Sequence, residues 1–143
     1  MNDWITALAV FDDGNGDALY AAGYFTIAGG AAANHVAKWN GSSWSALGSG
    51  ITSSTPYVNS LKVFDDGSGP ALYVGGNFTL AGGVAINRIA KWDGASWSAL
   101  GSGLNDSVSA LAVFDDGSGS ALHAGGNFAA GPAGDSYVAK WGC

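Results

Sequence analysis

The sequence has no glutamate, no glutamine and one cysteine, and only 5 of its 143 residues are lysine or arginine. The polar residues that favour helices are therefore nearly absent, and Gly, Ser, Asn and Asp, which favour turns, are abundant instead. Because every acidic residue is aspartate and the formal net charge is −6, the composition argues against binding nucleic acid or an anionic membrane.

Other absences narrow the class of protein further. No apolar run approaches the roughly 20 residues that a membrane-spanning helix needs. The first ten residues lack the basic start and apolar stretch of a signal peptide, so we expect any secretion signal of the natural protein to lie outside this chain. Cys143 has no partner for an internal disulfide, and we expect it to be an incidental free thiol.

What the chain does contain is one unit repeated three times. In the first copy, Ile5–Phe11 alternates and predicts a strand with Ile5, Ala7, Ala9 and Phe11 on one face. Aspartate followed by glycine in Asp12–Gly16 predicts a hairpin turn. The further strands that we expect are Ala18–Phe25, with a bulge or a close backbone approach at Gly23, and, beyond a glycine-rich connection, His35–Trp39 and Trp44–Leu47.

The other two copies follow the same order of elements. Phe11 maps to Phe64 and Phe114, and Trp39 maps to Trp92 and Trp141. The copies differ in length only within predicted loops, where insertions are tolerated. Four-strand units of about 50 residues are typical of β-propeller blades, and such a sheet must stack on neighbours because it cannot bury both faces alone.

The sequence LYVGGNF at 72–78, followed by RIAKWDGASWSAL at 88–100, resembles the kelch repeat. It is similar to kelch-like propeller repeats of bacterial secreted and surface proteins and of fungal cortical bud-site proteins, in which GGxF, AKWDG and WSALGSG recur in this order. The resemblance implies an all-β propeller in which the first strand of each blade lies nearest the axis and the fourth lies outermost. It also implies an extracellular or cell-surface parent protein, and it carries no catalytic motif.

We therefore predict one propeller segment with blades at 4–50, 51–103 and 104–143, the last ending after its third strand at VAKWGC. Such an arc of eleven strands would expose two apolar blade faces. Two copies would supply six blades, within the usual range for closed propellers, so we expect a head-to-tail homodimer. A nine-bladed trimer and a fragment of a longer extracellular propeller are the alternatives.

Three groups of residues could carry chemistry, and each has a structural interpretation that we favour. The pairs Asp12/Asp13, Asp65/Asp66 and Asp115/Asp116 could bind calcium, but hairpin turns capped by aspartate explain them without a metal. The repeated tryptophans Trp39, Trp44, Trp92, Trp97 and Trp141 could stack on sugars, but packing between blades explains them. His35 and His123 occupy different repeat positions, form no ligand spacing or triad, and predict no catalytic or metal site.

Loops remain as the place for a ligand. The loops between second and third strands and those between successive blades are expected to share one end of the fold, where Asn34, Asn87 and Asp135 are candidate ligand-binding residues. Asn34 and Asn87 are more readily explained as turn caps. The sequence thus predicts no enzyme and no cofactor, but a scaffold or interaction module that binds itself, with a carbohydrate-binding, lectin-like propeller as the alternative and carbohydrate or protein as further partners.

Overall fold

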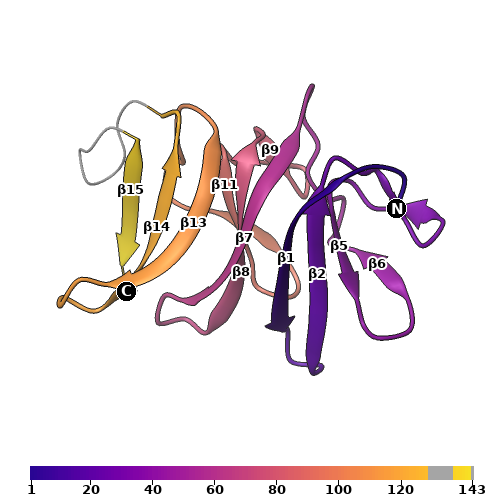
Figure 1. The fold of residues 1–143 in the computed structure, drawn as a ribbon, viewed down its shortest axis with the longest axis horizontal. Coiled ribbons are helices and arrows are strands. Elements are labelled where there is room, and N and C mark those ends of the chain that lie inside the picture. Colours follow the sequence, from indigo (N-terminus) through magenta and orange to yellow (C-terminus); the bar gives the residue numbers. More distant parts are fainter. Residues whose placement is uncertain (129–136, 143) are drawn as a thin grey trace.

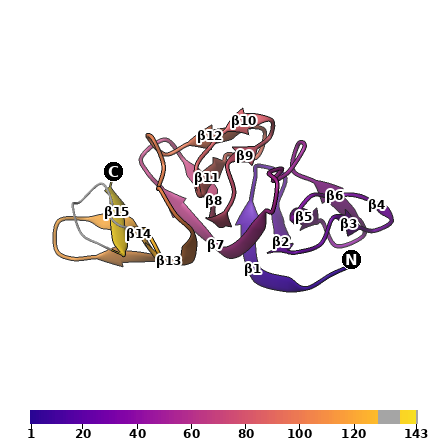
Figure 2. The same cartoon turned by 90° about the horizontal axis from the view of Figure 1, so that it is seen from above.

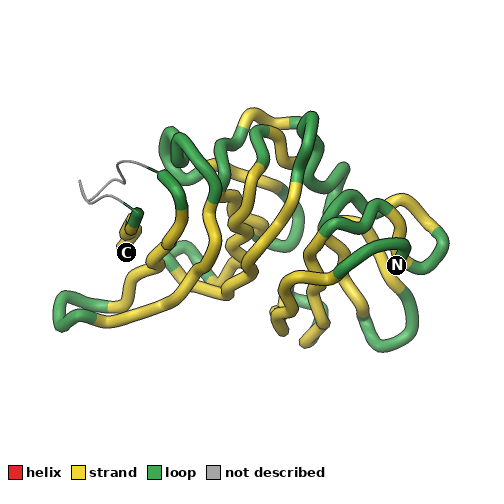
Figure 3. The backbone as a smooth tube through the Cα atoms, turned by 45° about the horizontal axis from the view of Figure 1, so that its top comes forward, coloured by secondary structure: helices red, strands yellow, loops and turns green. Residues whose placement is uncertain are grey.

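The computed structural model describes residues 1–128 and 137–142, and their regular structure consists of β-strands (Figure 1). Figure 3 shows these strands joined by turns and loops, and no helix in the described residues is long and apolar enough to cross a membrane. The strands form antiparallel sheets, none of which closes on itself. The all-β prediction is confirmed.

Three larger sheets follow one another along the chain. Sheet 1 contains β1 (Ile5–Asp12), β2 (Asp17–Gly23), β5 (Val36–Trp39) and β6 (Trp44–Ala46). Sheet 2 contains β7 (Tyr57–Asp65), β8 (Pro70–Asn77), β11 (Ile89–Trp92) and β12 (Trp97–Ala99). Sheet 3 contains β13 (Val108–Asp115), β14 (Ser120–Gly126) and β15 (Val138–Gly142).

Two small hairpins were not predicted. They lie in the glycine-rich connections between the second and third strands of sheets 1 and 2, where the sequence predicts only loops. They are formed by β3 (Ile27–Ala28) with β4 (Ala31–Ala32), and by β9 (Leu80–Ala81) with β10 (Val84–Ala85). The matching stretch of the third copy, which includes the candidate Asp135, lies outside the described residues.

The three sheets stand side by side in an arc (Figure 2). Their first strands, β1, β7 and β13, lie next to one another along one edge of the arc, while β6 and β12 lie on the far side of sheets 1 and 2. Each sheet therefore presents a face to its neighbour in the chain. Two apolar clusters fill the spaces between them, one joining sheets 1 and 2 and the other joining sheets 2 and 3.

A bulge in each first strand decides which sheet its side chains face. In β7 the register of the pairing with β8 shifts between Val58 and Ser60, and the same shift occurs at the matching points of β1 and β13. As a result Val58 packs with Leu61 toward sheet 1, whereas Phe64 packs toward sheet 3. The predicted face of β1 is therefore wrong for Ile5, which corresponds to Val58 and does not share the side of Ala7, Ala9 and Phe11.

Candidate functional site

The hairpin turns between first and second strands are built by the first aspartate of each Asp-Asp-Gly motif. The Asp12 Oδ1 atom accepts hydrogen bonds from the backbone N–H groups of Gly14 and Gly16, at 2.8 and 2.9 Å. Asp65 and Asp115 make the same pair of contacts in their own turns. The prediction of aspartate-capped hairpin turns is confirmed.

The second aspartate of each motif forms an ion pair that the sequence analysis missed. The Lys91 Nζ atom lies 2.7 Å from Asp66 Oδ2, and the Tyr73 hydroxyl donates to the same oxygen at 3.1 Å. Lys38 and Tyr20 contact Asp13 in the same way in sheet 1. In sheet 3, Lys140 pairs with Asp116 at 2.6 Å, and histidine replaces the tyrosine. The sequence did contain a signal for this ion pair, because the lysine of Ala-Lys-Trp recurs in every copy together with the aspartate.

These contacts shift the pKa values of the aspartates and of Tyr20. The Lys91 ammonium, helped by the Ser68 hydroxyl, holds the pKa of Asp66 well below its ordinary value of 3.8. Lys38 lowers the pKa of Asp13 in the same sense, with burial opposing it. Burial raises the pKa of Tyr20 above its ordinary value of 10.0, and the neighbouring Asp13 adds to this effect. The aspartates are thus held as carboxylates.

The oxygens that a calcium ion would need are engaged within the fold. The carboxylate oxygens of the Asp-Asp-Gly motifs accept hydrogen bonds from the turns and the lysines. Among residues 1–128 and 137–142, no group of three or more His, Cys, Asp or Glu side chains could hold a metal ion.

Asn34 and Asn87 lie where the sequence analysis expected them, in the loops between second and third strands. The Asn34 side-chain amide donates to the Ser49 carbonyl at 3.0 Å, and the Asn34 carbonyl accepts from the Ile51 N–H at 3.0 Å. Asn87 makes the equivalent contacts with Ser102 and Leu104. Both residues therefore fasten the segment between two sheets to the loop of the preceding sheet. Their use in binding a ligand stays a prediction.

The tryptophans pack mainly between sheets. Trp92 and Trp97 are buried in the cluster that joins sheets 1 and 2, with ring centroids 5.1 Å apart. Trp39 and Trp44 form the same pair at 5.3 Å on the outer side of sheet 1, where they are only half-buried. Position in the arc, rather than residue type, thus decides how much of each ring is covered.

The exposure of apolar side chains depends on position in the same way, and at the two ends of the arc these side chains form open apolar faces. On the open face of sheet 1, the Leu8 side chain is 58% exposed, whereas its counterpart Leu61 is 8% exposed against sheet 1. On the open face of sheet 3, Phe114 is 60% exposed, whereas its counterparts Phe11 and Phe64 are 3% and 6% exposed. We name these surfaces the leading face (Ile5, Leu8 and Val10) and the trailing face (Phe114 and Val138).

Polar contacts between neighbouring first strands also repeat. The Thr6 hydroxyl donates to the Val58 carbonyl, and the Asn59 side-chain amide donates to the Val108 carbonyl at 2.9 Å. Ser109 occupies the same position in β13, at the trailing end of the arc, and is exposed. Sheets 1 and 2 thus each carry a donor directed to the sheet that follows, and sheet 3 carries a hydroxyl at the same repeat position.

Comparison with protein-family models, with curated proteins and with solved structures gave no match. The physical features of the chain therefore define its candidate site. The most distinctive of these are the two open apolar faces, each a repeat of a surface that is buried between sheets inside the same chain.

Proposed function

We propose that the chain is a non-catalytic scaffold whose sheets are blades of a β-propeller, and that a second copy closes the ring head to tail. In this assembly the trailing face of each copy packs on the leading face of the other, giving six blades. The kelch-like repeat pattern supports the propeller architecture, and the arc of sheets with their first strands along one edge is consistent with it.

The observation that carries the proposal is the contrast between equivalent residues. Leu61 and Phe64 are buried because a neighbouring sheet covers them, whereas Leu8 and Phe114 are exposed at the ends of the arc. Burying a large apolar side chain contributes roughly 1.5–3 kcal/mol, so several such residues on each face favour association. The chain already contains the surface that would cover each open face. Inside the arc, residues equivalent to the leading face pack against residues equivalent to the trailing face.

The polar contacts extend this complementarity. Ser109 would donate to the carbonyl of Ile5 in the second copy, as Thr6 and Asn59 donate to Val58 and Val108 within the chain. The junction therefore has hydrogen-bonding potential as well as apolar area. A closed two-fold ring would contain this junction twice.

The experiment is a mass measurement by size-exclusion chromatography with light scattering. We expect about 28 kDa, twice the 14.2 kDa of one chain. Leu8→Lys and Phe114→Asp should each give a folded particle of one-chain mass, because a buried unpaired charge opposes the junction. Ser54→Asp, in an exposed loop away from both faces, is the matched control and should keep the mass of the unsubstituted chain. A stable monomer of the unsubstituted chain at high concentration would refute the assembly.

A further inference from the structure

The outer edge of sheet 3 offers a site of a different kind from the two open faces. In sheets 1 and 2 the third strand pairs on its outer side with a short fourth strand, through Trp39 with Trp44 and Trp92 with Trp97. In the described part of sheet 3, β15 pairs only with β14. Within residues 1–128 and 137–142, the outer edge of the Ala-Lys-Trp backbone at 139–141 is thus unpaired, and it has the same sequence as the two edges that are paired.

The fourth strand of sheet 2 shows what such an edge accepts. Trp97 opens β12, and its ring is 9% exposed between sheets 1 and 2. The Trp97 indole N–H donates to the Leu47 carbonyl at 2.9 Å, and the ring lies against Trp92. The indole is therefore held by an aromatic side chain of its own sheet and by the end of the preceding sheet's outer strand.

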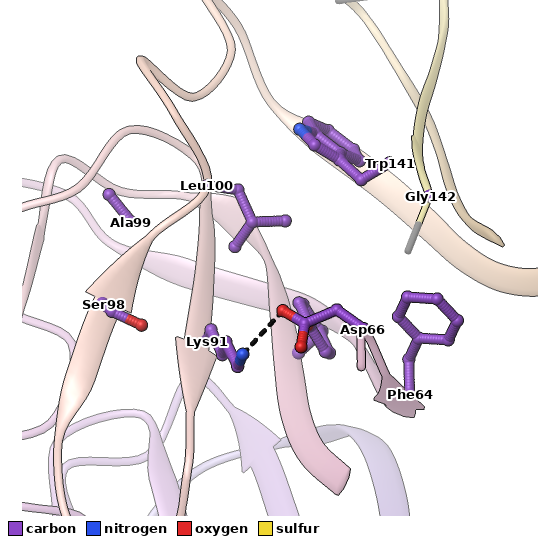
Figure 4. Close-up of a pocket in the computed structure, with 9 residues that line it drawn as sticks. Phe64, Asp66, Lys91, Ser98, Ala99, Leu100, Trp141 and Gly142 are labelled. Carbon is purple, nitrogen blue, oxygen red and sulfur yellow. Dashed lines mark hydrogen bonds and ion pairs between the residues drawn. The ribbon is translucent and has the colours of Figure 1, made fainter. Parts of the chain in front are cut away.

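The corresponding space between sheets 2 and 3 is a cavity of about 290 Å³. It is lined by Leu100 and Trp141, which are the repeat counterparts of Leu47 and Trp92, and by Phe64, Tyr73 and the ion pair of Asp66 with Lys91. Figure 4 shows Leu100, Trp141 and Phe64 around this space, with the ion pair beside it. The space that the Trp97 side chain fills between sheets 1 and 2 is therefore empty between sheets 2 and 3 in the part of the chain that the structure describes.

Exposure of the ion pairs leads independently to the same conclusion. Asp13 is covered by the turn between β11 and β12, where a Cβ atom on Gly94 would lie only 2.9 Å from the Asp13 Cβ atom. Its side chain is 6% exposed, whereas the equivalent Asp66 is 31% exposed. Leu47 is likewise buried and Leu100 only half-buried. Both differences have the same cause, because among the described residues sheet 3 contributes no turn and fourth strand to cover the outer part of sheet 2.

We propose that this edge binds an extended peptide of the Trp-Ser-Ala-Leu type, which adds a fourth strand to β15. The peptide tryptophan would occupy the cavity between Trp141 and Leu100 and donate its indole N–H to the Leu100 carbonyl. Main-chain pairing along 139–141 would supply general affinity and the tryptophan seat would supply specificity. The site lies within one chain and uses the outer edge of β15, whereas the trailing face uses the side of that strand on which Val138 lies, so peptide binding does not depend on ring closure.

The test uses the full chain and a fluorescein-labelled peptide, DGASWSALG, which copies residues 93–101. Fluorescence anisotropy should show saturable binding, and a peptide with its tryptophan replaced by alanine should bind at least about tenfold more weakly. In ¹⁵N-resolved NMR spectra, the amide shifts should change at 98–100 and 139–141. Absence of saturable binding, or equal binding of the alanine peptide, would overturn the proposal.

Protein variants separate this site from self-association. Leu100→Arg should abolish binding of the peptide, and Ser98→Arg, at the exposed rim of the cavity, serves the same purpose if the first variant fails to fold. Leu8→Lys, which alters only the leading face, should bind the peptide as the unsubstituted chain does. Shift changes at Leu8, Val10 and Phe114 in place of the cavity would place the peptide on the open faces and contradict the proposal.

Discussion

At the scale of single residues, one ion pair recurs in three settings within the same chain. The Asp13 carboxylate is 6% exposed, Asp66 is 31% exposed and Asp116 is 41% exposed, while each pairs with the lysine of its own sheet. Asp13 and Asp66 have the same lysine and tyrosine partners and differ in covering, so this pair of sites isolates the effect of burial. Exposed pairs contribute little to stability, whereas removing one partner of a buried pair leaves a charge without compensation.

We therefore expect Asp13→Asn to destabilise the protein by roughly 2 kcal/mol, between the values for exposed and fully buried pairs. The cause is that Lys38 and the Tyr20 hydroxyl both lose their charged partner in the interface of sheets 1 and 2. Asp66→Asn, the matched control, should change the stability much less, because Asp66 makes the same contacts with lysine and tyrosine but is 31% exposed. Urea denaturation followed by circular dichroism measures both, and equal effects of the two substitutions would contradict this interpretation.

At the scale of elements, the bulges of β1, β7 and β13 require glycine opposite them. A Cβ atom on Gly126 in β14 would lie 2.1 Å from the Ser107 carbonyl oxygen, and Gly23 and Gly76 meet equally close backbone oxygens. Backbone cannot move aside as a side chain can. The sequence analysis expected a bulge or close approach at Gly23, and both are present.

Gly126→Ala should consequently cost about 2–3 kcal/mol, as for overpacked interiors. Gly142 in β15 gives the matched control, because no atom lies within 4 Å of a Cβ placed there. Gly142→Ala should be neutral or slightly stabilising, since alanine restricts the unfolded chain. Denaturation midpoints of the two variants provide the comparison. A tolerated Gly126→Ala would mean that the bulge can relax.

The sequence predicted the elements well because their signals are local and occur in several copies. Alternation, Asp-Gly turns and a repeated unit placed the eleven main strands close to their observed bounds. The small hairpins were missed because their strands are two residues long. His35, Arg88 and Tyr137 adopt positive φ angles of 66–69°, although nothing in their residue types indicates it. The loops that lead into the third strands impose that backbone conformation, and it is visible only in the folded chain.

For the candidate site, the sequence indicated apolar surfaces but not which side chains form them. The repeat predicts that end sheets are open, whereas the sides on which Ile5 and Leu8 lie depend on the bulge. Predicting the cavity beside Trp141 likewise requires knowing that the Trp97 side chain reaches the Leu47 carbonyl of the preceding sheet. Contacts between units are set by stacking, which the pattern of a single unit does not contain.

At the scale of the whole molecule, the proposed ring makes a prediction about mixtures. A chain with Leu8→Lys keeps an unaltered trailing face, and a chain with Phe114→Asp keeps an unaltered leading face. Their heterodimer has one native junction and one junction in which lysine and aspartate carry opposite charges. We therefore expect the equimolar mixture to reach about 28 kDa at concentrations where each variant alone stays near 14.2 kDa.

Light scattering of the separate and mixed variants checks this prediction. A mixture of Ser54→Asp with either variant is the control for exchange of chains between dimers. The single variants also test the polarity of the junction. If Leu8→Lys alone remained a dimer while Phe114→Asp became a monomer, two trailing faces would meet each other, and the head-to-tail ring would be wrong. Recovery of the dimer only in the mixture requires that unlike faces meet, because neither chain then offers an intact pair to its own copy.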